Sequence, residues 1–291
     1  CSLRTHLEPL GVHPSMKAFK DRVAVITGGG SGIGLGIANA FAARGMRLVI
    51  ADVNEQTIEN TVFELKQNGV DAIGVRCDVS KLEDVEHLAE ATLNTFGGVH
   101  VLCNNAGVGL PTSSRSIKLE DWKWIIDVDL WGPIYGVKVF APLIEAQGEG
   151  HISATASMAG LISANKMGAY SVAKHGVVAL MCALERELRS KQSPITASVL
   201  CPGPINTNIS HNSLAYRPER DPTLAPPKVS GAKGASIQAA LEEGMPPNEV
   251  GELVASAIEN DKFWVLTHPW WAKGVQRQLD ALRDDQSLTK A

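Results

Sequence analysis

The chain has 291 residues, of which 44% are hydrophobic and 20% charged, which fits one large α/β domain or two small ones. Its formal net charge is −4 with no long run of one sign, which argues against a nucleic-acid or anionic-membrane surface. No stretch approaches about 18 uninterrupted apolar residues, so we expect no membrane-spanning helix and no membrane partner.

Residues 1–15 differ in character from the rest of the chain. They lack the basic-then-apolar order of a signal peptide, and the patterned sequence begins just after Met16. We expect a tag or disordered extension over 1–15 and a single catalytic domain over 16–291. The five cysteines are widely spaced, with no CxxC or Cys/His metal spacing. Free thiols in a reducing compartment, the cytoplasm, and no metal site are therefore expected.

A glycine-rich loop follows the first predicted strand, 22–27, and precedes a predicted helix, 35–44. The order of strand, glycine loop and helix is typical of a dinucleotide-phosphate site. Without Cβ atoms the loop can turn tightly and let a pyrophosphate approach the N–H groups at the helix N-terminus. The candidate residues in this loop are Gly28, Ser31, Gly32, Ile33 and Gly34.

The second strand, 46–51, ends at Asp52. A carboxylate at this strand end can bind both hydroxyls of an adenosine ribose and would repel a 2′-phosphate. No Arg or Lys occupies 29–31 or position 53, where a cation could offset that repulsion. The sequence therefore favours NAD over NADP. A helix-capping role for Asp52 is the alternative, although Asn54 could serve as that cap instead.

The alternation of strands and helices then repeats. A strand at 71–77 precedes Asp78 and Val79, a helix follows at 82–96 with Ser80 as its candidate cap, and a strand at 99–103 precedes Asn104. Repeated strand–helix units predict a doubly wound parallel sheet of about seven strands, a Rossmann-like single domain. Ligands bind beyond the carboxyl ends of such strands, where Asp52, Asp78 and Asn104 lie.

The second half continues the pattern up to residue 201. The stretch 117–146 is mostly helical with a break or kink at Gly132-Pro133, and strands are expected at 150–156 and 195–200. Between them, a helix from Tyr170 to about Lys191 is apolar on nearly every face. Burial on more than one side predicts that this helix packs against both the sheet and another subunit.

From about 205 to 247 the pattern dissolves into a stretch rich in Pro, Ser, Asn and Gly. Long irregular segments that follow a strand end often cover a substrate, so we expect a substrate lid there. A helix at 249–260, a strand at 263–267 and a charged helix at 274–283 follow. Trp270 and Trp271 are expected to pack, or to cover the substrate mouth or a subunit contact.

Tyr170 and Lys174 are four residues apart on a predicted helix and would share one face. A nearby lysine favours the phenolate and would lower the pKa of the tyrosine, giving a general acid/base that works near neutral pH. Taken alone, the pair is more often an ordinary helix start with an exposed lysine, and the rest of the chain must supply the reason to prefer the catalytic interpretation.

The ordered motifs TGGGSGIG, Asp52, Cys77-Asp78-Val79, NNAG, Ser157, YSVAK and PGP resemble the short-chain dehydrogenase/reductase family over about 20–270. The resemblance implies that Tyr170 is the general base or acid and that Lys174 binds the nicotinamide ribose. It implies that Ser157 binds the substrate oxygen. The implied cofactor-binding residues are Gly28, Ser31, Gly32, Ile33, Gly34, Asp52, Asp78, Val79, Asn105, Ala106, Gly107, Tyr170, Lys174, Pro202, Gly203, Ile205 and Thr207.

One departure from the family pattern concerns position 129. Family members usually carry asparagine in the segment V-N-L-x-G, which here reads Val128-Asp129-Leu130-Trp131-Gly132. We take Asp129 as a fourth candidate catalytic residue, acting in proton relay. A buried carboxylate would stabilise charged Lys174 and raise the pKa of the tyrosine somewhat. A role in the helix kink alone is the alternative.

These observations predict an NAD-dependent oxidoreductase that transfers a hydride between nicotinamide and a bulky, hydrophobic secondary alcohol or ketone, aryl or steroid-like. The alternatives are a carbonyl reductase working mainly in reverse and a non-catalytic NAD sensor or scaffold. The resemblance implies a homotetramer, with a dimer as the alternative.

Overall fold

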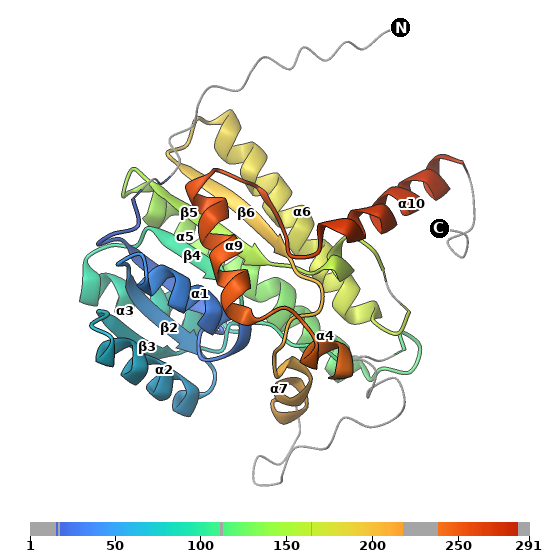
Figure 1. Cartoon of the computed structure of the whole chain (residues 1–291), viewed down its shortest axis with the longest axis horizontal. Helices are drawn as coiled ribbons and strands as arrows, with labels where there is room; N and C mark the ends of the chain where they lie inside the picture. The colour runs from blue at the N-terminus through green and yellow to red at the C-terminus, as the bar shows by residue number, and fades with distance from the viewer. Residues whose placement is uncertain (1–15, 17, 111–112, 164, 218–237, 285–291) are drawn as a thin grey trace, which may run out of the picture.

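The computed structural model describes residues 16, 18–110, 113–163, 165–217 and 238–284. These residues form one parallel sheet in the order β3-β2-β1-β4-β5-β6-β7 (Figure 1). The predicted doubly wound sheet of about seven strands is confirmed. The strands are β1 (Val23–Thr27), β2 (Arg47–Asp52), β3 (Ala72–Arg76), β4 (Val101–Asn104), β5 (Gly150–Thr155), β6 (Ile195–Cys201) and β7 (Trp264–Leu266).

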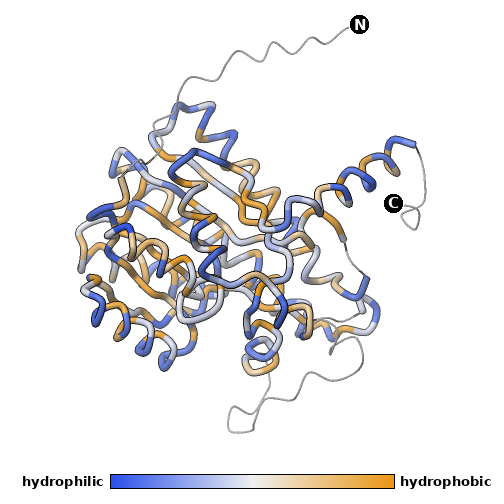
Figure 2. The backbone as a smooth tube through the Cα atoms, viewed as in Figure 1, coloured by the Kyte–Doolittle hydropathy of each residue, from blue (hydrophilic) through white to orange (hydrophobic). Residues whose placement is uncertain are grey.

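Helices cover both faces of the sheet because its strands are apolar on both sides. One core cluster joins the sheet to α3, α5 and α6, and a second joins it to α1, α2 and α9. Apolar residues accordingly gather along the central strands, and hydrophilic residues mark the outer helix faces (Figure 2). The helices are α1 (Gly32–Ala42), α2 (Glu55–Gln67), α3 (Leu82–Phe96), α4 (Leu119–Ile126), α5 (Gly132–Glu145), α6 (Gly168–Ser190), α7 (Ile209–Ala215), α9 (Pro247–Glu259) and α10 (Ala272–Arg283).

The two predicted helix caps have opposite outcomes. Asn54 caps α2, because its side-chain oxygen accepts hydrogen bonds from the N–H groups of Gln56 and Thr57. The predicted cap by Ser80 is wrong: α3 begins after Lys81 with no side-chain cap. The Ser80 hydroxyl donates instead to Asp78 at 2.6 Å. An acceptor two residues away therefore competes with the helix for this hydroxyl.

The expected break at Gly132 is a wide helical turn. Residues Asp127–Trp131 form a π-helix between α4 and α5, and the Gly132 N–H bonds to the carbonyl of Asp127. Pro133 has no N–H to continue a regular α-helical ladder, which favours the wider turn. A Cβ on Gly132 would lie 2.9 Å from Val79. Such π-turns are frequent at functional sites, and this one carries Asp129.

The stretch 205–247 contains more order than the sequence predicted. It includes α7, and Ile205 forms a β-bridge with Met245. Residues 218–237 of the expected lid lie outside the described residues, as does the expected extension over 1–15. No helix in the described part of the chain is long and apolar enough to cross a bilayer.

Candidate active site

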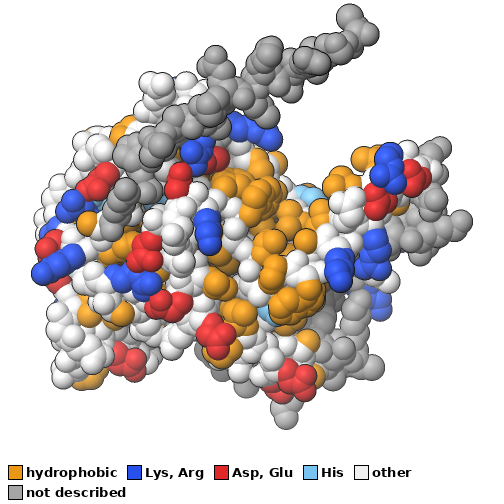
Figure 3. Space-filling model, turned by 45° about the horizontal axis from the view of Figure 1, so that its top comes forward, with side chains coloured by type: hydrophobic (Ala, Val, Ile, Leu, Met, Phe, Trp, Pro, Cys, Tyr) orange, Lys and Arg blue, Asp and Glu red, His pale blue; other side chains and the backbone are white. Residues whose placement is uncertain are grey.

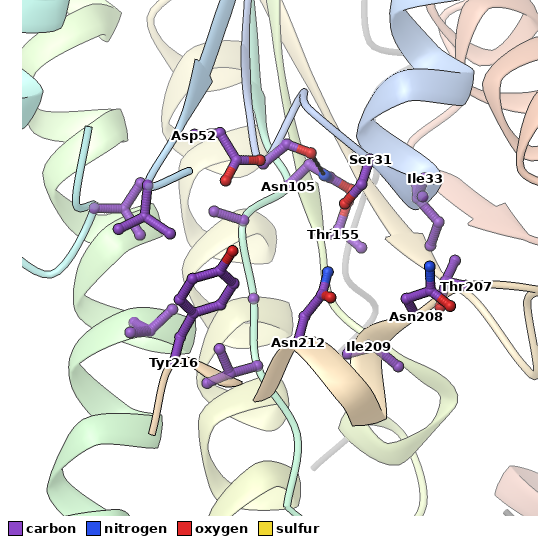
Figure 4. A pocket seen from close by; sticks show the side chains of 18 of the residues that line it. Ser31, Ile33, Asp52, Asn105, Thr155, Thr207, Asn208, Ile209, Asn212 and Tyr216 are labelled. Carbon is purple, nitrogen blue, oxygen red and sulfur yellow. Dashed lines mark hydrogen bonds between the residues drawn. The ribbon is translucent and has the colours of Figure 1, made fainter. Parts of the chain in front are cut away.

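A cavity of about 310 Å³ opens at the carboxyl ends of the strands, where the strand order reverses between β1 and β4 (Figure 4). Open parallel sheets bind ligands at this switch point. Most of the predicted site residues line the cavity: Gly28, Ser31, Gly32, Ile33, Asp52, Asp78, Val79, Asn105, Ala106, Gly107, Tyr170, Lys174, Pro202 and Thr207.

Particular positions from the glycine loop to the first turn of α1 require glycine. Gly28 and Gly32 have φ values of 62° and 52°, the left-handed region that disfavours side chains. A Cβ on Gly28 would lie 2.9 Å from the Cα of Ala106, and one on Gly34 would lie 2.1 Å from the Gly28 carbonyl oxygen. Gly34 does not line the cavity, but its lack of a side chain lets α1 pack closely against Gly28 of the loop. The loop leaves the N-terminus of α1 open to an anion, and so fits a dinucleotide pyrophosphate.

Asp52, at the end of β2, marks one end of the cavity together with Val53, Cys77, Asp78 and Val79. Its carboxylate accepts hydrogen bonds from the N–H groups of Gly30 and Asn54, each at 3.2 Å. Burial raises the pKa of Asp52, and these backbone hydrogen bonds oppose the rise. Among the described residues that line the cavity there is no arginine, and Lys174 is the single lysine.

Asn105 ties the ends of β1, β4 and β5 together below the cavity. Its backbone N–H donates to the Thr27 hydroxyl at 2.9 Å, and its side-chain amide donates to the Thr27 carbonyl at 3.1 Å. The Thr155 hydroxyl donates to Asn105 Oδ1 at 3.1 Å. Asn105 therefore holds the cavity floor in place.

Tyr170 and Lys174 face the cavity from the first turns of α6. The Lys174 ammonium is buried, donates to the Thr155 carbonyl at 3.0 Å and lies 5.6 Å from the centre of the Tyr170 ring. Burial raises the pKa of Tyr170, while Lys174 and a hydrogen bond with Ser157 lower it. Lys174 acts in the predicted direction, but burial outweighs it, so the expected net lowering of the pKa is wrong.

Asp129 lies behind Lys174 and is completely buried. Its Oδ1 accepts a hydrogen bond from the Val108 N–H at 2.7 Å, and its Oδ2 lies 3.6 Å from Lys174 Nζ. Burial raises the pKa of Asp129, and Lys174 opposes the rise. A Cβ on Gly107 would lie 3.2 Å from Lys174 Nζ, so a side chain at position 107 would crowd this ion pair.

Three further predicted site residues support the cavity without lining it. Ser157 Oγ accepts from the Ala159 N–H at 3.1 Å and shares a hydrogen bond with Tyr170. The Gly203 N–H donates to the Thr267 hydroxyl at 3.0 Å. Ile205 is buried and bridges to Met245. The structure thus places Ser157 against Tyr170, while Gly203 and Ile205 do not line the cavity beside Pro202.

Several cavity residues were not predicted as site residues. Trp124 and Val128 come from the helical stretch before α5, where the sequence pattern indicates that apolar side chains belong to the hydrophobic core. Asn208, Ile209, Asn212 and Tyr216 come from α7 and its flanks, which carry no motif. The full additional set is Val53, Cys77, Trp124, Val128, Thr155, Ala156, Asn208, Ile209, Asn212 and Tyr216. Val108, which follows the NNAG turn and which the sequence indicates as a substrate contact, also lines the cavity. The strand-end positions of Cys77, Thr155 and Ala156 could have indicated these three residues, and the lid expected over 205–247 indicated the segment of α7 but not its individual residues.

Other residues weighed from the sequence lie outside the cavity. Trp270 and Trp271 are 60% and 40% exposed and pack around His268. No group of three or more potential metal ligands occurs among the described residues.

Comparison with known proteins agrees with this geometry. A family model described as short chain dehydrogenase matches residues 22–217. A CLA biosynthesis dehydrogenase/reductase of Lactiplantibacillus plantarum is 33% identical, with 93% of this chain and 96% of that protein covered. A C alpha-dehydrogenase of Sphingobium is 32% identical, with 92% and 88% covered. A short-chain dehydrogenase/reductase of Burkholderia phymatum, solved in complex with NAD, is 38% identical with a TM-score of 0.89, covering 95% and 99%.

Proposed function

The chain belongs to the short-chain dehydrogenase family, and we propose that it is an NAD-dependent oxidoreductase acting on a secondary alcohol or its ketone. The observation that carries this proposal is the shared cavity. It brings the glycine loop and Asp52 together with Tyr170 and Lys174. The loop suits a pyrophosphate, and the tyrosine suits proton exchange with a hydroxyl.

In this proposal, bound NAD supplies the acceptor for the hydride that leaves the carbinol carbon. Tyr170 accepts the proton of the substrate hydroxyl during oxidation and returns it during reduction. Lys174 stabilises the phenolate electrostatically. The Ala159 N–H holds the Ser157 hydroxyl in place, and this hydroxyl forms a hydrogen bond with the same substrate oxygen as Tyr170. The partly buried tyrosine lines the cavity, where the substrate hydroxyl can approach its phenol oxygen.

We expect Asp52→Ser to exchange cofactor preference. Removing the carboxylate deletes a charged hydrogen-bond acceptor for the ribose and the charge that repels a 2′-phosphate. With a charged hydrogen bond contributing about 1.5–3 kcal/mol, kcat/KM with NAD should fall about 10- to 100-fold, while kcat/KM with NADP should rise. Steady-state kinetics with both cofactors measures this, with Asp71→Ser, an exposed position before β3, as control. An unchanged ratio of the two values would refute the assigned role of Asp52.

Asp129 is proposed to act in proton relay through Lys174. Its negative charge raises the pKa of Tyr170. Asp129→Asn keeps an acceptor for the Val108 N–H but removes that charge, so the phenolate becomes easier to form. Oxidation needs the deprotonated tyrosine, and therefore the rising limb of the kcat/KM–pH profile should move to lower pH. A profile that stays in place, or moves to higher pH, would leave Asp129 with only a structural role in the π-turn.

The proposed substrate is bulky and hydrophobic, aryl or steroid-like. Val108, Trp124, Val128 and Ile209 give the cavity an apolar side next to Tyr170, and the described parts of 205–247 are proposed to form the lid over it. The Sphingobium relative named C alpha-dehydrogenase is consistent with oxidation. A carbonyl reductase working in reverse is the alternative, and Asp52 favours the NAD-linked oxidative direction.

The test is formation of NADH, followed by absorbance, with a panel of aryl, alicyclic and steroid secondary alcohols. Turnover of at least one bulky member, with little on short aliphatic alcohols, is expected. NAD binding without turnover across the panel would favour a non-catalytic NAD sensor instead.

We also propose a homotetramer in the cytoplasm. Val172 on α6 is 52% exposed despite its apolar helix, and Trp264, Trp270 and Leu279 are exposed near α10. Apolar side chains gather on the face between the body and this projecting helix (Figure 3). The free cysteines of the described chain suit a reducing compartment. Light scattering should give the mass of four chains; the mass of one would exclude the assembly.

A further inference from the structure

A contact from the end of α7 crosses the cavity near Asp52. Tyr216 follows α7, lines the cavity and directs its phenol oxygen toward the strand end that carries Asp52 (Figure 4). The side-chain amide of Asn54 donates a hydrogen bond to this oxygen at 2.5 Å, between residues 162 positions apart in the chain. The contact therefore joins the end of α7 to the N-terminus of α2.

Asn54 is held in place by its other hydrogen bonds. Its Oδ1 caps α2 by accepting from the N–H groups of Gln56 at 3.0 Å and Thr57 at 3.3 Å. Its backbone N–H donates to Asp52 Oδ1 at 3.2 Å. Asn54 thus connects the carboxylate assigned to the adenosine ribose directly with the tyrosine that follows α7.

Two further contacts attach the same segment to the rest of the domain. The Ser213 hydroxyl accepts from the Gly109 N–H at 2.8 Å and donates to the Ile209 carbonyl at 2.6 Å. Arg217 forms an ion pair with Asp121 of α4, whose side chain is 5% exposed. Together with the Tyr216 contact, these bonds attach the segment to three separate parts of the domain.

We propose that Asn54 and Tyr216 form a latch that retains the adenosine half of the nucleotide. The phenol ring lines the same cavity as Asp52, Val53 and Val79, so in this proposal it forms part of the wall of the adenosine subsite. The Asn54–Tyr216 hydrogen bond holds the ring in that place. A ligand that binds only the closed arrangement loses apparent affinity when the closed fraction falls. This proposal rests on the proposed NAD-dependent function and adds a cofactor-retaining role for a residue pair that carries no family motif.

The test measures binding of ADP-ribose, which contains the adenosine half without nicotinamide, by titration calorimetry of the full chain. Tyr216→Phe removes only the hydroxyl, and Asn54→Ser keeps a helix-capping oxygen but removes the amide donor. Each variant should bind ADP-ribose and NAD about 3- to 10-fold more weakly, as expected for the loss of one hydrogen bond. Tyr135→Phe, on α5 and outside the cavity lining, is the matched control and should bind as the unchanged protein does.

The double variant Tyr216→Phe/Asn54→Ser separates the latch from two independent effects. Because both changes remove the same bond, the double variant should bind no more than about twofold more weakly than either single variant. Three results would each overturn the latch. Both single variants could bind as the unchanged protein does, or the losses of the two single variants could multiply in the double variant. Binding of NAD could also weaken while binding of ADP-ribose does not. Failure of the unchanged protein to bind either ligand would overturn the proposed function as well.

Discussion

Replacing Tyr170 by phenylalanine should lower kcat about 100- to 10,000-fold while leaving the Kd for NAD within about threefold. The phenol oxygen is the group that would exchange the substrate proton, and both Lys174 and Ser157 interact with it at the cavity wall. Phenylalanine keeps the ring that packs near the Lys174 ammonium, so the cavity shape is preserved. Single-turnover formation of NADH with a substrate from the alcohol panel measures the chemical step directly.

The matched control for this substitution is again Tyr135→Phe, whose ring lies 5.4 Å from Trp131 on the helical stretch away from the cavity. It should retain full activity. If Tyr170→Phe retained more than about a tenth of the activity, Tyr170 could not be the principal proton-transfer group.

Replacing Lys174 by methionine should abolish most activity and also destabilise the fold. The ammonium is 3% exposed and lies 3.6 Å from the completely buried Asp129 carboxylate, so its loss leaves that charge without a counterion. Breaking a buried ion pair from one side costs about 3–5 kcal/mol, less where the remaining acid takes up a proton. Thermal unfolding should therefore show a clear fall in Tm. Lys66→Met, at an exposed position on α2, is the control and should show none.

The pH dependence of this loss follows from Asp129. Burial raises the pKa of Asp129 in the folded state, so the folded chain binds a proton at pH values where the unfolded chain has released it. Stability from this group is present below its unfolded pKa of about 4 and is lost as pH rises through its folded pKa. Lys174 opposes the rise in the pKa of Asp129, so without Lys174 this loss of stability with rising pH is larger. The deficit of the variant should be greatest near neutral pH and should shrink as pH falls.

A second substitution separates the ion pair from the catalytic role of the lysine. Lys174→Met/Asp129→Asn removes both charges, so it should recover much of the lost Tm while activity stays low. Recovery of activity together with stability would mean that Lys174 contributes only to folding. No recovery of Tm would mean that the remaining Asp129 charge is not the source of the instability.

The fold and more than half of the cavity-lining residues could be predicted from local sequence motifs. The glycine loop, Asp52, Asn105 and the Tyr170–Lys174 pair each belong to a short motif whose geometry is local. Their side chains converge because parallel strands end at the same edge of the sheet. The same locality explains the correct cap at Asn54, whose partners are two and three residues away.

Contacts between distant segments could not be predicted in this way, because they depend on how the whole chain packs. Tyr216 reaches Asn54 across 162 positions, and nothing local in the stretch after β6 indicates that contact. Asp129 could be suspected from the sequence, but its complete burial and its distance to Lys174 follow from the packing of the π-turn against α6. The direction of the Tyr170 pKa shift was likewise set in three dimensions. A neighbouring lysine can be read from spacing, whereas the desolvation that outweighs it depends on every segment that covers the ring.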